Sequence, residues 1–159
     1  MKLRIHKCVS GKIKQLLLEA FPLVTARLGI SGYEGTIELH IGSAAGEGGS
    51  TGPKSSRVNV RRLDAGRRPI EFGMYLRPDS LAQMFPVFCH EMIHIKQWVT
   101  GQLGAKFVDG DVQQMYYSVA IDADSIPYRE QPWEKEAFDG MHDLAECVLG
   151  QLVRQKEKV

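Results

Sequence analysis

The stretch "FCHEMIHIKQW", residues 88–98, places two histidines four positions apart, with a glutamate directly after the first. In an α-helix, residues four apart lie on the same face, so His90 and His94 would point the same way. Glu91 would lie about 100° further round the helix. The pattern predicts a helix that carries two metal ligands and, beside them, a carboxylate able to act on a water.

Helix signals surround this stretch. Asp79 or Ser80 is suited to begin a helix, and Gly101 is suited to end it. Pro86 is expected to kink or shorten the first turns. We therefore expect the two histidines near the middle of one helix over residues 80–100.

The segment "EQPWEKEAFDG", residues 130–140, offers the third ligand. We expect a last helix from Pro132 to the basic C-terminal end. Helical steps from Glu134 reach only apolar residues, namely Phe138, Met141, Ala145, Val148 and Leu152. Glu136 lies about 200° away on a mostly polar face. A buried carboxylate is costly unless it is paired or bound to metal, so we predict Glu134 as a ligand and Glu136 as solvated.

An alternative for Glu134 is a buried salt bridge, or a first-turn carboxylate favoured by the helix dipole. The ligand interpretation rests on the upstream histidines. Two histidines and one glutamate form a ligand set typical of catalytic Zn²⁺, which leaves a fourth position for water. Glu91 would then be the general base.

Such a site also needs a hydrogen-bond donor for a developing oxyanion. The candidates are Tyr116, Tyr117, Tyr128 and His142. We select Tyr128, because it lies six residues before Glu134 in the segment that leads to the ligand helix. The alternative is that Tyr128 only packs near this loop.

The other segments indicate a single α+β domain over residues 1–159. Periodicity and turn residues predict, in chain order, a helix from Ser10 to Gly29, a strand at 36–42, a mobile glycine- and serine-rich loop at 42–56, a short strand at 57–61, a strand at 69–75 and a hairpin around Asp109-Gly110.

Composition limits the classes of partner. The chain has 43% hydrophobic and 25% charged residues, and a net charge of +1. This balance argues against a protein that binds nucleic acid by bulk charge. Arginines do cluster at positions 57, 61, 62, 67 and 68, and a solvated loop is the favoured interpretation over a nucleic-acid surface.

Location is indicated by what the sequence lacks. No apolar run is long enough to cross a membrane, and the N-terminus has no signal-peptide pattern. The three cysteines, Cys8, Cys89 and Cys147, are odd in number and widely spaced, which favours reduced thiols. We expect a cytoplasmic protein without a membrane partner.

The motif "HEMIH" followed by "PWEKEA" resembles the gluzincin branch of the zincin metallopeptidases, in particular the small stand-alone domains of phage and bacterial genomes. It is more distantly similar to ImmA/IrrE-type and SprT-like peptidase domains. The resemblance covers residues 69–145. It implies a zincin-like fold, with a small, mostly antiparallel sheet packed on the histidine helix and on the glutamate helix.

The resemblance also implies roles. His90, His94 and Glu134 would bind Zn²⁺, and Glu91 would be the general base of a peptidase acting on protein or peptide. The strand at 69–75 would run along the cleft and pair with extended substrate. One position departs from the pattern: where many gluzincins have an acidic residue four after the ligand glutamate, this chain has Phe138, with Asp139 next.

Two other functions remain open at this stage. One is a non-catalytic binding module that keeps the metal for stability, against which the presence of Glu91 argues. The other is a DNA-associated, SprT-like protease recruited through the arginine-rich segment.

Overall fold

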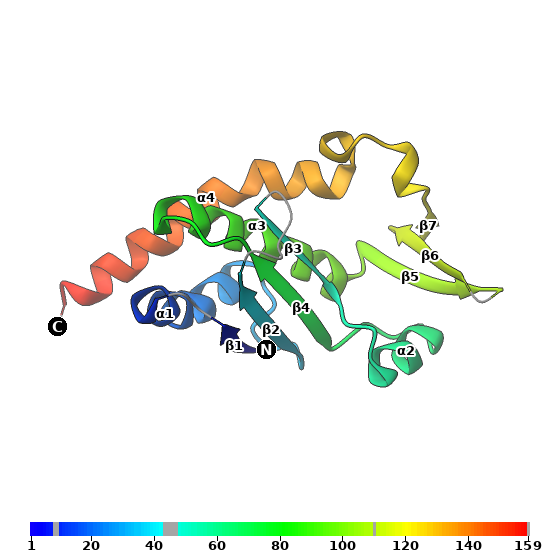
Figure 1. Ribbon diagram of the computed structural model, residues 1–159, viewed down its shortest axis with the longest axis horizontal. Coiled ribbons are helices and arrows are strands. Elements are labelled where there is room, and N and C mark those ends of the chain that lie inside the picture. The colour runs from blue at the N-terminus through cyan, green and yellow to red at the C-terminus, as the bar shows by residue number, and fades with distance from the viewer. Residues whose placement is uncertain (8–9, 43–47, 110, 159) are drawn as a thin grey trace.

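The structure, a computed structural model, describes residues 1–7, 10–42, 48–109 and 111–158 (Figure 1). The elements follow in the order β1 (Lys2–Lys7), α1 (Gly11–Arg27), β2 (Thr36–Ile41), β3 (Gly49–Pro53), α2 (Arg57–Asp64), β4 (Glu71–Leu76), α3 (Leu81–Thr100), β5 (Leu103–Val108), β6 (Asp111–Tyr116), β7 (Val119–Ala120), the 3₁₀ turns η1 (Ala123–Ser125) and η2 (Tyr128–Glu130), and α4 (Pro132–Lys156). Within the described residues, four α-helices and two sheets form the predicted mixed α+β fold.

The larger sheet has the strand order β1-β2-β4-β3. β1, β2 and β4 are parallel, and β3 is antiparallel to β4. The expectation of a mostly antiparallel sheet against the histidine helix is therefore wrong. The reason lies in the connections, because β1 reaches β2 through α1, and a crossover of this length places neighbouring strands parallel.

The strand expected at residues 69–75 is present as β4, but it does not lie at the edge of the sheet. β4 pairs with β2 on one side and with β3 on the other, so its backbone groups are already bonded. Residues 69–75 therefore cannot take up an extended substrate as predicted. The outermost strand on this side is β3.

β3 lies inside the segment that we expected to be a mobile loop, so that expectation is wrong for residues 49–53. Its sequence, Gly-Ser-Thr-Gly-Pro, has little strand propensity of its own. Pairing with β4 holds it in place, and the Thr51 hydroxyl also donates to the Gly73 carbonyl at 2.9 Å. Residues 43–47 of the expected loop lie outside the described residues.

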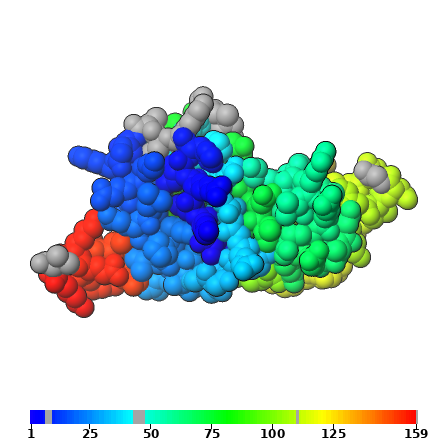
Figure 2. Space-filling view, turned by 90° about the horizontal axis from the view of Figure 1, so that it is seen from below, coloured from blue at the N-terminus to red at the C-terminus, as the bar shows by residue number. Residues whose placement is uncertain are grey.

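One face of this sheet carries the core. Inward residues alternate along β2 and β4, and the buried ones are Ile37, Leu39, Ile41, Phe72, Met74 and Leu76. They pack against the buried faces of α1, α3 and α4. The opposite face has no helix over it among the described residues (Figure 1), and β1 lies at the surface along one edge of the sheet (Figure 2).

α3 is confirmed as the helix that bears the histidines. It begins after Ser80 and ends at Gly101, whose φ of 81° is the left-handed conformation that glycine adopts freely. Of the two effects expected of Pro86, shortening is wrong because the helix runs through it from Leu81, and a kink stays a prediction. Because Pro86 lies near the start, only the carbonyl of Ala82 loses its helical partner.

The other two long helices follow their predictions. α1 runs from Gly11 to Arg27 with Pro22 inside it, and α4 begins at Pro132 in its first turn. The sequence reasoning missed β1, which pairs with β2 along the N-terminal edge of the sheet.

The strand predicted at residues 57–61 is a helix, α2. Val58 and Val60 suggest alternation, but both are exposed. Ser56 caps the helix by accepting from the Asn59 amide at 3.2 Å, and the buried Asn59 carboxamide binds the backbone of the segment leading into β4. These polar contacts, rather than apolar periodicity, set the local structure.

The predicted hairpin is present as β5 and β6, with Val108 paired to Asp111. Asp109 has a φ of 52°, as a tight turn requires, and Gly110 lies outside the described residues. The hairpin and the C-terminal end of α4 lie at opposite ends of the molecule (Figure 1). None of the described helices is both long and apolar enough to cross a bilayer.

Candidate metal centre

α3 brings His90, Glu91 and His94 into the interior. Their exposed fractions are 4%, 3% and 7%. α3 is packed between the sheet and α4, so nearly every face of the helix is buried, including the faces that carry polar residues. These three residues are therefore enclosed and need partners.

Glu134, in the first turn of α4, supplies the partner. It is 7% exposed, as the sequence predicts for a carboxylate on the apolar stripe. Its Oε2 lies 3.2 Å from His90 Nε2 and 3.3 Å from His94 Nε2. The two Nε2 atoms are 3.1 Å apart, so three candidate ligand atoms form a nearly equilateral triangle.

This triangle has the size that a metal ion requires. A tetrahedral zinc ion with bonds of about 2.0–2.1 Å holds its ligands about 3.3 Å apart. The observed edges, 3.1–3.3 Å, match this spacing without any movement of the side chains. The buried group His90, His94 and Glu134 can thus hold a metal ion.

The charge of Glu134 suits a cation. Burial alone would raise its pKa, but hydrogen bonds from His90 and His94 outweigh burial and lower the pKa to about 2. Burial would likewise lower the pKa of His94, yet its contact with Glu134 raises it. Glu134 is therefore ionised at neutral pH and attracts positive charge to the point where the two imidazoles meet.

Gln97 orients His94, and the sequence reasoning missed it. Its Nε2 donates to the Trp133 carbonyl at 2.9 Å and to Glu136 at 3.1 Å, which leaves Oε1 facing His94 Nδ1 at 2.8 Å. An amide oxygen only accepts, so the proton of a neutral His94 lies on Nδ1. The lone pair on Nε2 then points at the metal position.

Glu136 belongs to this support and is not free in solvent as predicted. It accepts from Lys96 at 2.6 Å, from Gln97, and from Gln102 at 2.9 Å. Glu136 lies on the side of α4 that faces the end of α3. The prediction failed because the other residues on this helix face are mostly polar and suggested contact with solvent.

His90 lacks comparable support. Within the described residues, His90 Nδ1 has no hydrogen-bond partner. Phe138, which stands where the pattern that the motif resembles often has an acidic residue, places its ring against His90 with 4.6 Å between centroids. Asp139 pairs instead with Lys135 at 3.5 Å on the surface, so it does not take over that role.

Glu91 lies beside the triangle and not within it. Burial raises its pKa to about 7, with a further contribution from Glu134. Its carboxylate lies close against Gly49 of β3, where an added Cβ would be 2.8 Å from Oε1. Glu91 is thus a buried carboxylate near its titration point at neutral pH, as a general base should be.

These residues open into a cavity of about 470 Å³. Its walls come from β3, α3, η2 and the start of α4. The lining residues include Gly49, Ser50, Thr51, Val87, Tyr128, Arg129, Phe138 and Met141. The open side of the ligand triangle faces this space, so a small molecule or chain segment can approach.

Tyr128 is brought to the site as predicted, since it lines the cavity. Burial and a hydrogen bond to Glu134 raise its pKa, so the hydroxyl keeps its proton at neutral pH. Its role as an oxyanion donor stays a prediction. The other candidates, Tyr116, Tyr117 and His142, do not line this cavity.

Arg129 was not foreseen. Its guanidinium lies 5.1 Å above the Phe138 ring, at the cavity wall. Cys89 is a buried packing residue, as expected, and Trp133 packs against Tyr116 with 5.5 Å between ring centroids. Trp98 does not line this cavity.

The arginine-rich segment is not part of this centre. Arg57, Arg61 and Arg62 lie on α2, and Arg62 donates to the Arg68 carbonyl at 2.6 Å. Arg67 and Arg68 line a separate cavity of about 460 Å³ between α2 and β5.

Comparison with known proteins adds no relative. No family model, no curated protein and no solved structure matches this chain. The site must therefore be interpreted from its own geometry.

Proposed function

We propose that the protein is a zinc-dependent metallopeptidase with a zincin-like arrangement. The single observation that carries the proposal is the buried triangle of His90, His94 and Glu134 with the non-ligand Glu91 beside it, all facing one open cavity. Imidazole and carboxylate ligands suit zinc, and three ligands leave a position for water or substrate.

When bound, zinc would supply Lewis acidity for the attack of water on an amide carbonyl. Glu91 would take the proton of that water and deliver it to the leaving amine, a task that fits a carboxylate lying beside the ligands without being one of them. Tyr128 would turn its hydroxyl from the Glu134 carboxylate toward the oxyanion and donate its hydrogen bond there. Gln97 would keep His94 in the tautomer that binds metal.

The substrate would pair with β3 and not with residues 69–75. β3 is the outer strand of the sheet, and its residues Gly49, Ser50 and Thr51 line the cavity. An extended peptide added to this edge would carry its backbone past Glu91. We propose protein or peptide substrates for this reason.

Cys89 and Cys147 form no disulfide, and Cys8 lies outside the described residues. The cytoplasmic location remains a prediction. The non-catalytic alternative is disfavoured because, among the described residues, the buried group has three members and an open fourth side. The DNA-associated alternative predicts salt-dependent DNA binding that is lost when Arg61, Arg62, Arg67 and Arg68 are neutralised.

The test compares Glu91→Gln with Glu146→Gln on the exposed part of α4. Each protein is analysed for zinc and incubated with a peptide library, with new N-termini detected by mass spectrometry. We expect one zinc per chain in both, and loss of cleavage by at least ~100-fold in Glu91→Gln only. Cleavage by Glu91→Gln at the rate of the unaltered protein would refute the assignment.

A further inference from the structure

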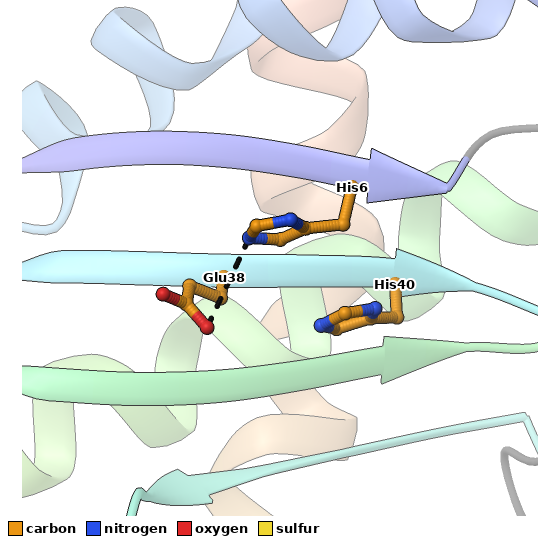
Figure 3. A group of neighbouring side chains, drawn as sticks. All are labelled: His6, Glu38 and His40. Carbon is orange, nitrogen blue, oxygen red and sulfur yellow. Dashed lines mark ion pairs between the residues drawn. The ribbon is translucent and has the colours of Figure 1, made fainter.

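The open face of the larger sheet carries a second group of candidate ligands: His6 on β1, and Glu38 and His40 on β2 (Figure 3). Their side chains project away from the helices, which lie behind the sheet in this view. We propose that these three residues form a second, surface site for a divalent transition-metal ion such as Zn²⁺. The inference does not depend on the proposed peptidase function.

Strand geometry brings the three side chains together. Glu38 and His40 are two residues apart on one strand, so they share a face. In the neighbouring strand, Ile5 pairs with Leu39 and Lys7 with His40, which makes His6 the extra residue of a β-bulge. Ile5 shares the inward face with its partner Leu39, so alternation along β1 places His6 on the outward face with Glu38 and His40.

Distances support a shared ion. The possible ligand atoms lie within 4.8 Å of one another, and His6 Nε2 is 3.8 Å from Glu38 Oε2. The His6 and His40 rings are nearly parallel, with centroids 4.9 Å apart. Both sets of distances exceed those of the buried triangle, and two stacked rings cannot both aim an in-plane nitrogen lone pair at one ion. The exposed His6 ring must therefore rotate out of the stack on binding, and we expect this site to be the weaker one.

The chemistry favours transition metals over Ca²⁺ or Mg²⁺. Two imidazoles and one carboxylate suit Zn²⁺, Ni²⁺ and Cu²⁺, whereas the hard cations prefer sets of oxygen ligands. His6 is 45% exposed and Glu38 is 26% exposed. Water can therefore complete the coordination. Tyr75 stacks on His40 with ring centroids 5.2 Å apart and limits the rotation of that ring.

A cation already occupies part of this group. Lys54 donates to Glu38 Oε2 at 2.5 Å, and this hydrogen bond lowers the pKa of Glu38. The carboxylate is therefore ionised at neutral pH and attracts positive charge. A metal ion must compete with Lys54 for the Glu38 carboxylate, so removal of the Lys54 ammonium group should tighten metal binding.

The experiment uses the 159-residue chain carrying one equivalent of zinc in the buried centre. Further ZnCl₂ is titrated by calorimetry, and the imidazole nitrogens are followed by NMR. We expect a second saturable equivalent that shifts the ring signals of His6 and His40 and not those of His142. His40→Ala and His6→Ala should each weaken it by at least ~10-fold, whereas His142→Ala should leave it unchanged.

Lys54→Met supplies the second arm. Removing the competing ammonium should tighten the second equivalent several-fold, and Lys12→Met, an equal change of net charge on α1, should not. If His40→Ala does not fold, His6→Ala still tests the proposal, because His6 is at the surface and its replacement should not disturb folding. The proposal is overturned if the zinc-loaded protein takes up no second equivalent, or if His6→Ala and His142→Ala weaken it equally.

Discussion

At the scale of single residues, the meeting of His90, His94 and Glu134 was predictable from the sequence, and the residues that support them were not. The sequence indicates His90, His94 and Glu134 because helical spacing places all three on inward helix faces. Gln97 is three residues after His94, on the same side of α3, so a signal did exist. What the sequence could not show is that Trp133 and Glu136, from another helix, fix its amide.

Gln97→Ala is expected to weaken zinc binding by about 10–100-fold, because His94 would lose the acceptor that holds its Nδ1 proton. Competition with a chelator of known affinity measures the change. Gln102→Ala is the matched control, since Gln102 donates to the same Glu136 carboxylate but does not reach His94. Equal loss of affinity in both variants would assign the effect to Glu136 and not to His94.

Glu91 leads to a prediction about the metal-free protein. Burial raises its pKa from an ordinary value of 4.5 to about 7, so the folded state prefers the protonated acid. For such a group the stabilising contribution is complete below pH 4.5 and is lost as pH rises through 7. Above pH 7, folding must bury a charged carboxylate that water would otherwise solvate.

Glu91→Gln should therefore stabilise the metal-free protein at pH 8 by ~2–3 kcal/mol, and much less at pH 5. Urea unfolding in the presence of EDTA at both pH values measures the difference. Glu146→Gln, at an exposed position, should show no such pH dependence. A gain at pH 5 as large as that at pH 8 would show that folding does not raise the pKa of Glu91.

At the scale of elements, segments with a strong hydrophobic period were predicted correctly. Segments whose conformation depends on contacts with neighbouring elements were not. α1, α3, α4, β2 and β4 carry their own hydrophobic pattern. β3 carries none, and its strand conformation comes from β4. For α2 the sequence showed a pattern that does not determine the structure. Val58 and Val60 alternate as in a strand, but the polar contacts of Asn59 determine the conformation.

β3 also sets the geometry of the site. Gly49 faces α3, and a Cβ there would meet Glu91 Oε1 at 2.8 Å and Val87 Cγ1 at 3.0 Å. Any side chain at this position must displace Glu91, Val87 or the strand. The glycine is therefore required by the close approach of strand and helix.

Gly49→Val should lower kcat/KM by about 100-fold, since a displacement of the catalytic base by about 1 Å has a cost of this order. Zinc affinity should change by less than ~3-fold, because the three ligands come from α3 and α4. Gly52→Val is the control, as a Cβ at Gly52 meets nothing within 4 Å. Kinetics with a cleaved library peptide test this, and loss of zinc in Gly49→Val would contradict it.

At the scale of the whole molecule, the metal ion would join elements that are distant in sequence. His90 and His94 belong to α3, and Glu134 begins α4, which also packs on α1 and the core. Lys156 near the end of α4 pairs with Glu19 of α1 at 3.0 Å. The candidate metal centre therefore lies where the long C-terminal helix packs against the rest of the fold.

Removal of zinc should consequently destabilise the entire chain and not only the site. If free zinc exceeds the dissociation constant about 1,000-fold, binding contributes ~4 kcal/mol, which corresponds to a rise in Tm of about 8–16 °C for a chain of this size. Thermal unfolding with zinc and with EDTA measures this difference.

Two variants separate this linkage from catalysis. Glu91→Gln keeps all three ligands, so it should retain the full zinc-dependent rise in Tm while losing cleavage. Glu134→Ala should lose most of the rise, because the ion would no longer connect α3 to α4. Free zinc must be kept low enough to leave the weaker surface group at His6, Glu38 and His40 unfilled. If Glu134→Ala kept the full rise under that condition, the ion that stabilises the protein would lie elsewhere.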